Sequence, residues 1–195
     1  MAPDLSTVVL TRTPFWFMRH GETDWNRDGL IQGRTDVPLN AEGWAQAHAA
    51  SGVLAGRGIT AIRCSPLQRA HDTATIVGEA LGVPVEVMAG LREANFGVQE
   101  GQPMGDWFTH WSSGETSPVG GEAFADLCVR AVAAMNAVLQ TPGLVLVVAH
   151  GGFFRAVRAA MGMSPAVRTA NGVPVFCDPA AEGWRLVTPG ELPRA

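Results

Sequence analysis

The chain has 195 residues, of which 47% are hydrophobic, and we expect a single domain over residues 1–195, because a chain of this length can bury about 70% of its unfolded surface. All 14 residues counted as lysine or arginine are arginines, which excludes a Schiff-base lysine, a Walker A lysine and the lysine of a protein-kinase site. The net charge of −4, without a basic cluster, argues against nucleic acid as a partner.

The first predicted strand is the apolar run Phe15–Met18, which leads directly into Arg19, His20, Gly21 and Glu22. A strand that ends in a glycine-containing loop exposes the next side chains at the carboxyl edge of a sheet. Open α/β sheets bind their ligands at this edge. We therefore expect Arg19 and His20 to project into a site.

The next predicted elements are a helix over Ala41–Leu54 and a strand over Ile59–Cys64. A second helix is expected to begin directly after this strand, with Ser65 as its N-cap and Pro66 at its first position. Arg69 would then lie one turn inside the helix. An arginine at such a position is usually solvated or a packing residue, but its neighbours here favour a functional role.

Glu93 is the candidate carboxylate of the site, because it lies in short apolar surroundings between Leu91 and Phe96. Such surroundings favour the protonated form of a carboxyl group. Glu22 and Glu100 are the nearby alternatives. We expect Glu22 to orient a neighbouring histidine or arginine instead.

The stretch from Val98 to Gly121 is irregular and rich in glycine, serine and tryptophan. Trp107 and Trp111 are four residues apart, which predicts that they share one face of a short helix. They could pack against the core or form a wall that faces a substrate, since glycine-rich flanks suit a loop or lid.

A second buried strand, Leu144–Ala149, ends in His150, Gly151 and Gly152, as the first ends in a histidine and a glycine. Strands and helices alternate along the chain, which predicts an α/β sheet with helices on both faces and the two histidine strands adjacent or nearly so. The remaining strand and helix candidates are Val83–Val87, Val173–Cys177 and Trp184–Val187, and helical stripes through residues 67–81 and 124–138.

Other histidines and the cysteines lack a functional setting. No pair of them has the short spacing of metal ligands, so no metal is expected. The odd number and wide separation of the cysteines, and a start without a basic or long apolar segment, predict a reduced, cytoplasmic protein. No apolar run approaches the length of a membrane span. The residues concerned are His48, His71, His110, Cys64, Cys128 and Cys177.

From Phe15 to about Trp184 the chain resembles the histidine phosphatase superfamily, the phosphoglycerate mutase-like proteins. The order and spacing of several short motifs together carry this resemblance. These motifs are Arg19-His20-Gly21-Glu22-Thr23 with Asn26, Gln32-Gly33 with Asp36 and Pro38-Leu39, Ser65-Pro66-Leu67 with Arg69-Ala70 and Thr73-Ala74, Glu93 with Phe96-Gly97, Gly120-Gly121-Glu122, and His150-Gly151-Gly152.

The resemblance implies a three-layer sandwich with a central, mostly parallel sheet, and a cap over the site at about residues 98–121. It implies that His20 is the phosphorylated nucleophile and Glu93 the proton donor, without a cofactor. Arg19, Arg69 and His150 would bind the phosphoryl group. Asn26, Gln32 and Gly151 are expected to contribute to substrate binding.

The chemistry of these residues agrees with those roles. Two arginines and a second histidine supply the dispersed positive charge that phosphoryl transfer needs. A neutral imidazole can form a covalent intermediate, and its other ring nitrogen needs an acceptor such as a backbone carbonyl. One carboxyl group can serve first as acid and then as base.

The predicted function is therefore hydrolysis of a small-molecule phosphomonoester through a phosphohistidine. The alternatives are a cofactor-dependent phosphoglycerate mutase, an α-ribazole phosphatase and a non-catalytic phosphate-binding regulatory protein. No lysine or arginine lies between Arg92 and Arg130, whereas the mutases hold a second anionic group with basic cap residues. This favours a phosphatase that prefers esters with neutral, apolar or aromatic leaving groups.

Overall fold

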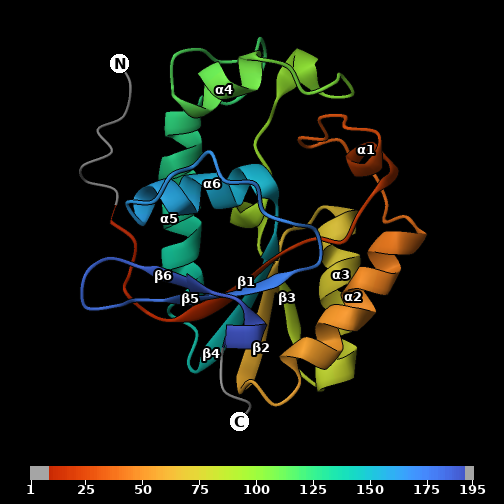
Figure 1. The fold of residues 1–195 in the computed structure, drawn as a ribbon, viewed down its shortest axis with the longest axis vertical. Helices are drawn as coiled ribbons and strands as arrows, with labels where there is room; N and C mark the ends of the chain where they lie inside the picture. Colours follow the sequence, from red (N-terminus) through yellow and green to blue (C-terminus); the bar gives the residue numbers. More distant parts are fainter. Residues whose placement is uncertain (1–8, 192–195) are drawn as a thin grey trace.

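The computed structural model describes residues 9–191. A six-stranded sheet in the order β3-β2-β4-β1-β5-β6 forms its centre (Figure 1). The first four of these strands in the sheet are parallel, and β5 runs antiparallel to both of its neighbours. The strands are β1 (Phe15–Arg19), β2 (Ile59–Cys64), β3 (Val85–Val87), β4 (Leu144–Ala149), β5 (Pro174–Asp178) and β6 (Arg185–Val187).

Helices cover both faces of the sheet, as the alternation of strands and helices predicts. Figure 1 shows α2 and α3 on one side of the sheet and α5 and α6 on the other. The predicted three-layer α/β arrangement with a mostly parallel sheet is confirmed. The helices are α1 (Asp24–Arg27), α2 (Ala41–Leu54), α3 (Gln68–Leu81), α4 (Trp107–Ser112), α5 (Phe124–Val138) and α6 (Gly151–Ala160), with short 3-10 turns at Ala89–Leu91, Gly97–Gln99 and Pro189–Glu191.

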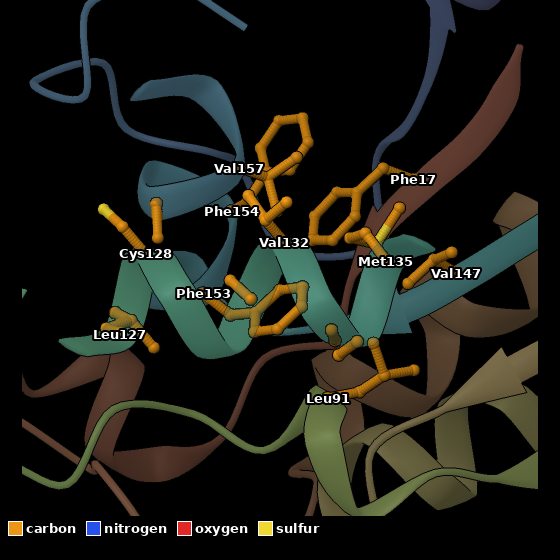
Figure 2. Close-up of a cluster of buried hydrophobic side chains, with 14 of the residues drawn as sticks. Phe17, Leu91, Leu127, Cys128, Val132, Met135, Val147, Phe153, Phe154 and Val157 are labelled. Atoms are coloured by element: carbon orange, nitrogen blue, oxygen red, sulfur yellow. The ribbon is translucent and has the colours of Figure 1, made fainter. Parts of the chain in front are cut away.

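The strand β4 and the first four residues of β1 are apolar because each strand contributes to both faces of the core. Phe17 and Val147 point toward α5 and α6, where Phe17 stacks on Phe154 with 3.8 Å between ring centroids (Figure 2). Trp16 and Leu146, one residue earlier in each strand, belong to the second cluster, beneath α2 and α3. Two separate hydrophobic layers thus fix the centre of the sheet.

The two histidine strands are direct neighbours, as predicted. β1 pairs with β4 in parallel, with Arg19 opposite Ala149. The N–H of His20 donates to the carbonyl of Ala149 at 3.0 Å. This register places His20 and His150 side by side, with 5.2 Å between their ring centroids.

The predicted start of α3 is wrong. The helix begins at Gln68 rather than directly after Ser65, so Arg69 is its second residue. Asp36, from a distant loop, caps this end of α3 by accepting a hydrogen bond from the N–H of Gln68 at 2.7 Å. The hydroxyl of Ser65 is used elsewhere, by His150.

Two glycines allow α2 to pack main chain against main chain behind the loop that carries His20. A Cβ atom on Gly43 would clash with the carbonyl of Glu22, and one on Gly21 would clash with the carbonyl of Gly43. Backbone atoms cannot move aside as a flexible side chain can. The main chain of α2 at Gly43 therefore fixes the position of the loop that carries His20. Between residues 9 and 191, no helix is long and apolar enough to cross a membrane.

Candidate active site

A cavity of about 680 Å³ lies where β1 and β4 end. It is lined by seven of the eight residues that the sequence analysis assigns to the site, which are Arg19, His20, Asn26, Gln32, Arg69, Glu93 and Gly151. The eighth, His150, is fully buried beside His20. The residues come from segments that lie far apart in the sequence and meet at this edge of the sheet.

His20 is buried, and both of its ring nitrogens have partners. Nδ1 lies 2.7 Å from the carbonyl oxygen of Gly21, the kind of backbone acceptor expected from the sequence. Since a carbonyl can only accept, Nδ1 carries the proton. Nε2 is then unprotonated, and its lone pair accepts a hydrogen bond from Nε of Arg69 at 3.2 Å. Burial, followed by the charges of Arg69 and Arg19, lowers the pKa of His20 well below its ordinary value, so the ring is neutral.

Arg69 is a buried guanidinium that is held by carbonyl groups rather than by a carboxylate. Its Nη1 donates to the carbonyl of Thr35 and its Nη2 to that of Gly33, each at 2.8 Å. Burial lowers the pKa of Arg69 to about 10, which still leaves it charged at neutral pH. The positive charge is thus fixed in place without being cancelled.

Arg19 supplies a second positive charge beside the first. Its Nη1 donates to the carbonyl of Thr169 at 3.0 Å, while its buried Nε has no hydrogen-bond partner. Burial lowers the pKa of Arg19 to about 10, against the opposing effect of Glu93. Neither Arg19 nor Arg69 forms an ion pair with a carboxylate in the described part of the chain.

His150 is oriented by Ser65, a contact that the sequence analysis missed. Nε2 of His150 lies 2.7 Å from the Ser65 hydroxyl oxygen, which also accepts from the N–H of Leu67 at 3.3 Å. Ser65 can therefore donate its own proton to Nε2, which puts the imidazole proton on Nδ1. That Nδ1 is buried and has no partner. Burial first, and then Arg69, lowers the pKa of His150 well below its ordinary value.

Glu93 does not lie in merely apolar surroundings, contrary to expectation. Its Oε1 accepts from the N–H groups of Ala94 at 2.9 Å and Phe153 at 2.7 Å, and its Oε2 accepts from that of Gly152 at 2.8 Å. The carboxylate thus caps the N-terminus of α6, where N–H groups and the helix dipole favour negative charge. A Cβ atom at position 152 would lie 2.7 Å from Oε1, so any larger residue there would displace the carboxylate.

The alternative carboxylates have other partners. Glu100 does not line the cavity, and it binds the N–H groups of Arg34, Thr35 and Phe96. Glu22 lines the cavity, but Oε1 accepts from Asn40 at 3.0 Å. Among the described residues Glu22 has no hydrogen bond or ion pair with a histidine or arginine side chain, so its expected orienting role is wrong.

Glu100 occupies a space that only a glycine leaves open. Gly33 has a φ of 53°, and a Cβ atom there would clash with the Glu100 carboxylate. Glu100 therefore fixes the loop around Gly33 through a hydrogen bond with the N–H of Arg34. Carbonyl groups of the same loop accept hydrogen bonds from Arg69.

The three additional binding candidates are all at the cavity wall. Oδ1 of Asn26 accepts from Nδ2 of Asn171 at 3.1 Å, and the same amide donates to the carbonyl of His20 at 2.9 Å. Gln32 is buried, and its Oε1 has no partner. A Cβ atom on Gly151 would approach Nε of Arg19 to 3.4 Å. Asn171, like Ser65, is a site residue that local sequence patterns do not reveal.

The two tryptophans of α4 pack against the core. Trp111 is fully buried and donates from Nε1 to the carbonyl of Glu122 at 2.9 Å. Trp107 packs edge-on against Phe96 with 5.7 Å between ring centroids. Neither lines the cavity, whereas Phe108, which lies between them in α4, does.

Beyond Arg19 and Arg69, three arginines among residues 9–191 line the cavity, which are Arg27, Arg155 and Arg168. The sequence analysis looked for cations in the predicted cap, between Arg92 and Arg130, and did not consider Arg155 and Arg168. The cap contains no lysine or arginine, but Arg155 and Arg168 bring positive charge to the cavity from other segments. No three or more histidine, cysteine, aspartate or glutamate side chains of residues 9–191 are grouped as metal ligands would be.

The comparisons with known proteins agree with this geometry. The histidine phosphatase superfamily (branch 1) model matches residues 15–177. The chain is 37% identical to a probable phosphoglycerate mutase of Yersinia enterocolitica, over 70% of this chain and 68% of that protein. It is 33% identical to an uncharacterized phosphatase of Bacillus subtilis, over 89% and 92% of the two chains.

Solved structures show the same fold. A mycobacterial glucosyl-3-phosphoglycerate phosphatase in complex with VO3 superposes with a TM-score of 0.79 at 30% identity, over 90% of this chain and 97% of that one. A putative α-ribazole-5'-P phosphatase of Escherichia coli superposes with a TM-score of 0.78 at 27% identity, over 95% and 98% of the two chains.

The neutral buried histidines predict a pH-dependent stability. The unfolded chain binds protons at His20 and His150 near pH 6.5, which the folded protein does not bind, so the free energy of unfolding falls as the pH drops below this value. The expected loss is at most about 1.4 kcal/mol per pH unit for each histidine. Urea denaturation between pH 7.5 and 5.0 in phosphate-free buffer measures it. His20→Asn should weaken this dependence, whereas replacement of the exposed His48 by asparagine should not. Equal pH profiles for wild type and His20→Asn would contradict the assignment.

Proposed function

This chain belongs to the histidine phosphatase superfamily, and we propose that it hydrolyses a small-molecule phosphomonoester, without a metal, through a phosphohistidine at His20. The observation that carries this proposal is a neutral imidazole next to two guanidinium groups that have no carboxylate partner among residues 9–191. A phosphoryl dianion supplies the missing negative charge. Relatives named as phosphatases support hydrolysis as the overall reaction.

The first chemical step is attack of Nε2 of His20 on phosphorus. The lone pair of Nε2 forms the P–N bond while the bond between phosphorus and the ester oxygen breaks. Arg19 and Arg69 stabilise the charge on the equatorial oxygens, and Nδ1–H of His150 donates to one of them. The contact of His20 Nδ1 with the carbonyl of Gly21 stabilises the positive charge that develops on the ring.

In the second step water attacks the phosphohistidine and releases inorganic phosphate and neutral His20. Glu93 donates a proton to the leaving oxygen in the first step and accepts one from water in the second. Its three main-chain N–H donors hold the carboxylate in one position.

Hydrolysis is favoured over the mutase alternative by the composition of the segment that we propose as a cap, residues 98–121. It contains no lysine or arginine, whereas the mutases of this family hold a second anionic group with basic residues of the cap. Met104 and Phe108 from this segment line the cavity instead.

We also propose a cytoplasmic location. The support for this is that Cys64, Cys128 and Cys177 are buried free thiols, and burial raises the pKa of the Cys64 thiol to about 11. Such thiols are inert packing groups in a reducing compartment.

Phosphorylation of His20 is the direct test of the proposed mechanism. Brief reaction with p-nitrophenyl phosphate, an alkaline quench that preserves phosphohistidine, and peptide mass analysis should place one phosphate on His20. Arg69→Met should reduce kcat/KM about a hundredfold or more, because it removes a preorganised charge from the transition state. Exposed Arg92, changed to methionine, serves as the matched control. Phosphate on His150 instead, or a mild effect at Arg69, would contradict the assignments.

Glu93→Gln separates the acid and base steps. p-Nitrophenolate leaves without a proton, so phosphorylation of His20 by p-nitrophenyl phosphate should remain fast while hydrolysis of the phosphoenzyme slows. In stopped-flow experiments we expect Glu93→Gln to release a rapid burst of p-nitrophenol, followed by slow steady-state turnover. With an alkyl phosphate both steps should slow. Glu22→Gln, a change at another carboxylate of the cavity wall, should show neither effect. Uniform losses on both substrates would mean that Glu93 only shapes the site.

A further inference from the structure

Arg155 and Arg168 form a second group of positive charge in the cavity, separate from the phosphoryl-binding pair. Arg155 extends from α6, one turn after Gly151, and its guanidinium lies 5.0 Å from the ring centroid of Phe108. Its Nη1 donates to the carbonyl of Pro165. Arg168 lies on the loop between α6 and β5, and Thr169, next to it, binds Arg19 through its carbonyl. The loop is thus fixed to the phosphoryl site.

The charges of this pair have no negative partner. Neither Arg155 nor Arg168 forms an ion pair with a carboxylate anywhere in the described part of the chain. Arg27, also at the cavity wall, shows the contrast, since it pairs with both Asp24 and Asp28.

Arg155 and Arg168 line the same cavity as Arg19 and Arg69. Burial lowers the pKa of Arg155, and the charges of Arg158 and Arg168 lower it further, while Glu93 opposes them. The charge of Arg168 also acts on Arg19. Because like charges at this density repel, an anion placed among them lowers the energy of the whole group.

The acidic residues of the cavity wall cannot supply that anion. Those that line it are Glu22 and Glu93. Glu93 is bound by three main-chain N–H groups, and Glu22 accepts from Asn40. The negative charge therefore has to come from a ligand.

We propose that Arg155 and Arg168 form a subsite for a second anionic group of the substrate, a carboxylate or a second phosphate, while the transferred phosphoryl group occupies the site of Arg19 and Arg69. This inference rests on the proposed phosphatase function and names its substrate class. Phe96, Met104 and Phe108 form the apolar wall of the same cavity. The substrate class is a phosphomonoester whose leaving group carries an anion and an apolar portion, rather than a neutral leaving group.

A matched pair of esters tests the subsite. 3-Carboxyphenyl phosphate and 3-carbamoylphenyl phosphate have nearly the same shape and differ by one negative charge. The wild-type protein should show a kcat/KM about tenfold higher for the carboxylate, the value of one charge-assisted contact. Resorcinol bisphosphate in place of the carboxylate ester distinguishes a subsite for phosphate from one for carboxylate.

Variants assign the preference to the two arginines. Arg168→Gln removes a charge from an exposed side chain, and Arg155→Met keeps the apolar contact with Phe108 while removing the charge. Each should bring the carboxylate-to-carbamoyl ratio toward one and leave kcat/KM for the carbamoyl ester within about twofold. Exposed Arg92, changed to glutamine, is the control for net charge. Equal values for the two esters in the wild type, or an unchanged ratio in both variants, would overturn the subsite.

A binding measurement distinguishes failure of the subsite proposal from failure of the proposed phosphatase function. If neither ester is hydrolysed, the phosphatase proposal fails. Calorimetry with the non-hydrolysable analogues 3-carboxybenzylphosphonate and 3-carbamoylbenzylphosphonate then tests the subsite by binding alone. About tenfold tighter binding of the carboxylate, lost in Arg168→Gln, supports it. Equal dissociation constants for the two phosphonates overturn it.

Discussion

Two guanidinium groups without carboxylate partners, at the end of the central parallel strands, are the constraint on which the rest of this structure depends. Arg69 is fully buried and Arg19 partly so, and main-chain carbonyls fix both without cancelling their charge. Their field, together with burial, keeps His20 neutral. Burial of a charge without a counterion is costly, so this arrangement is suited to a site that an anion completes.

The surrounding main chain binds the nearby carboxylates, so that none of them in the described part of the chain forms an ion pair with these arginines. The main-chain N–H groups at the start of α6 hold the Glu93 carboxylate, and Glu100 is bound by the loop around Gly33. Ser65 occupies Nε2 of His150 and so directs its proton to the unpartnered Nδ1. Close packing of Gly21 on Gly43 fixes the His20 loop from behind. The donors are therefore oriented before a ligand arrives, which is how preorganised electrostatic stabilisation acts.

The sheet and most of the site residues could be predicted because local patterns determine them. Apolar runs such as Phe15–Met18 form strands that are buried on both faces, and a histidine-glycine pair after such a run marks a ligand-binding edge. The errors come from contacts between distant segments. Ser65 was expected to cap α3, but it binds His150, 85 residues away, and Asp36 caps the helix instead. Arg155 lies three residues after Gly152, and Arg168 lies on the loop between α6 and β5. No local pattern shows that both side chains reach the same cavity.

The central claim is that the charge of Arg19 and Arg69 is compensated by a phosphoryl dianion. The most direct test is the thermal stability of the intact protein at pH 7.5 as a function of inorganic phosphate, with chloride used to keep the ionic strength constant. The melting temperature should rise with phosphate concentration, corresponding to about 2.7 kcal/mol at a hundredfold excess over Kd, and Arg69→Met should abolish the rise. No stabilisation of the wild type, or equal stabilisation of the variant, would contradict the account.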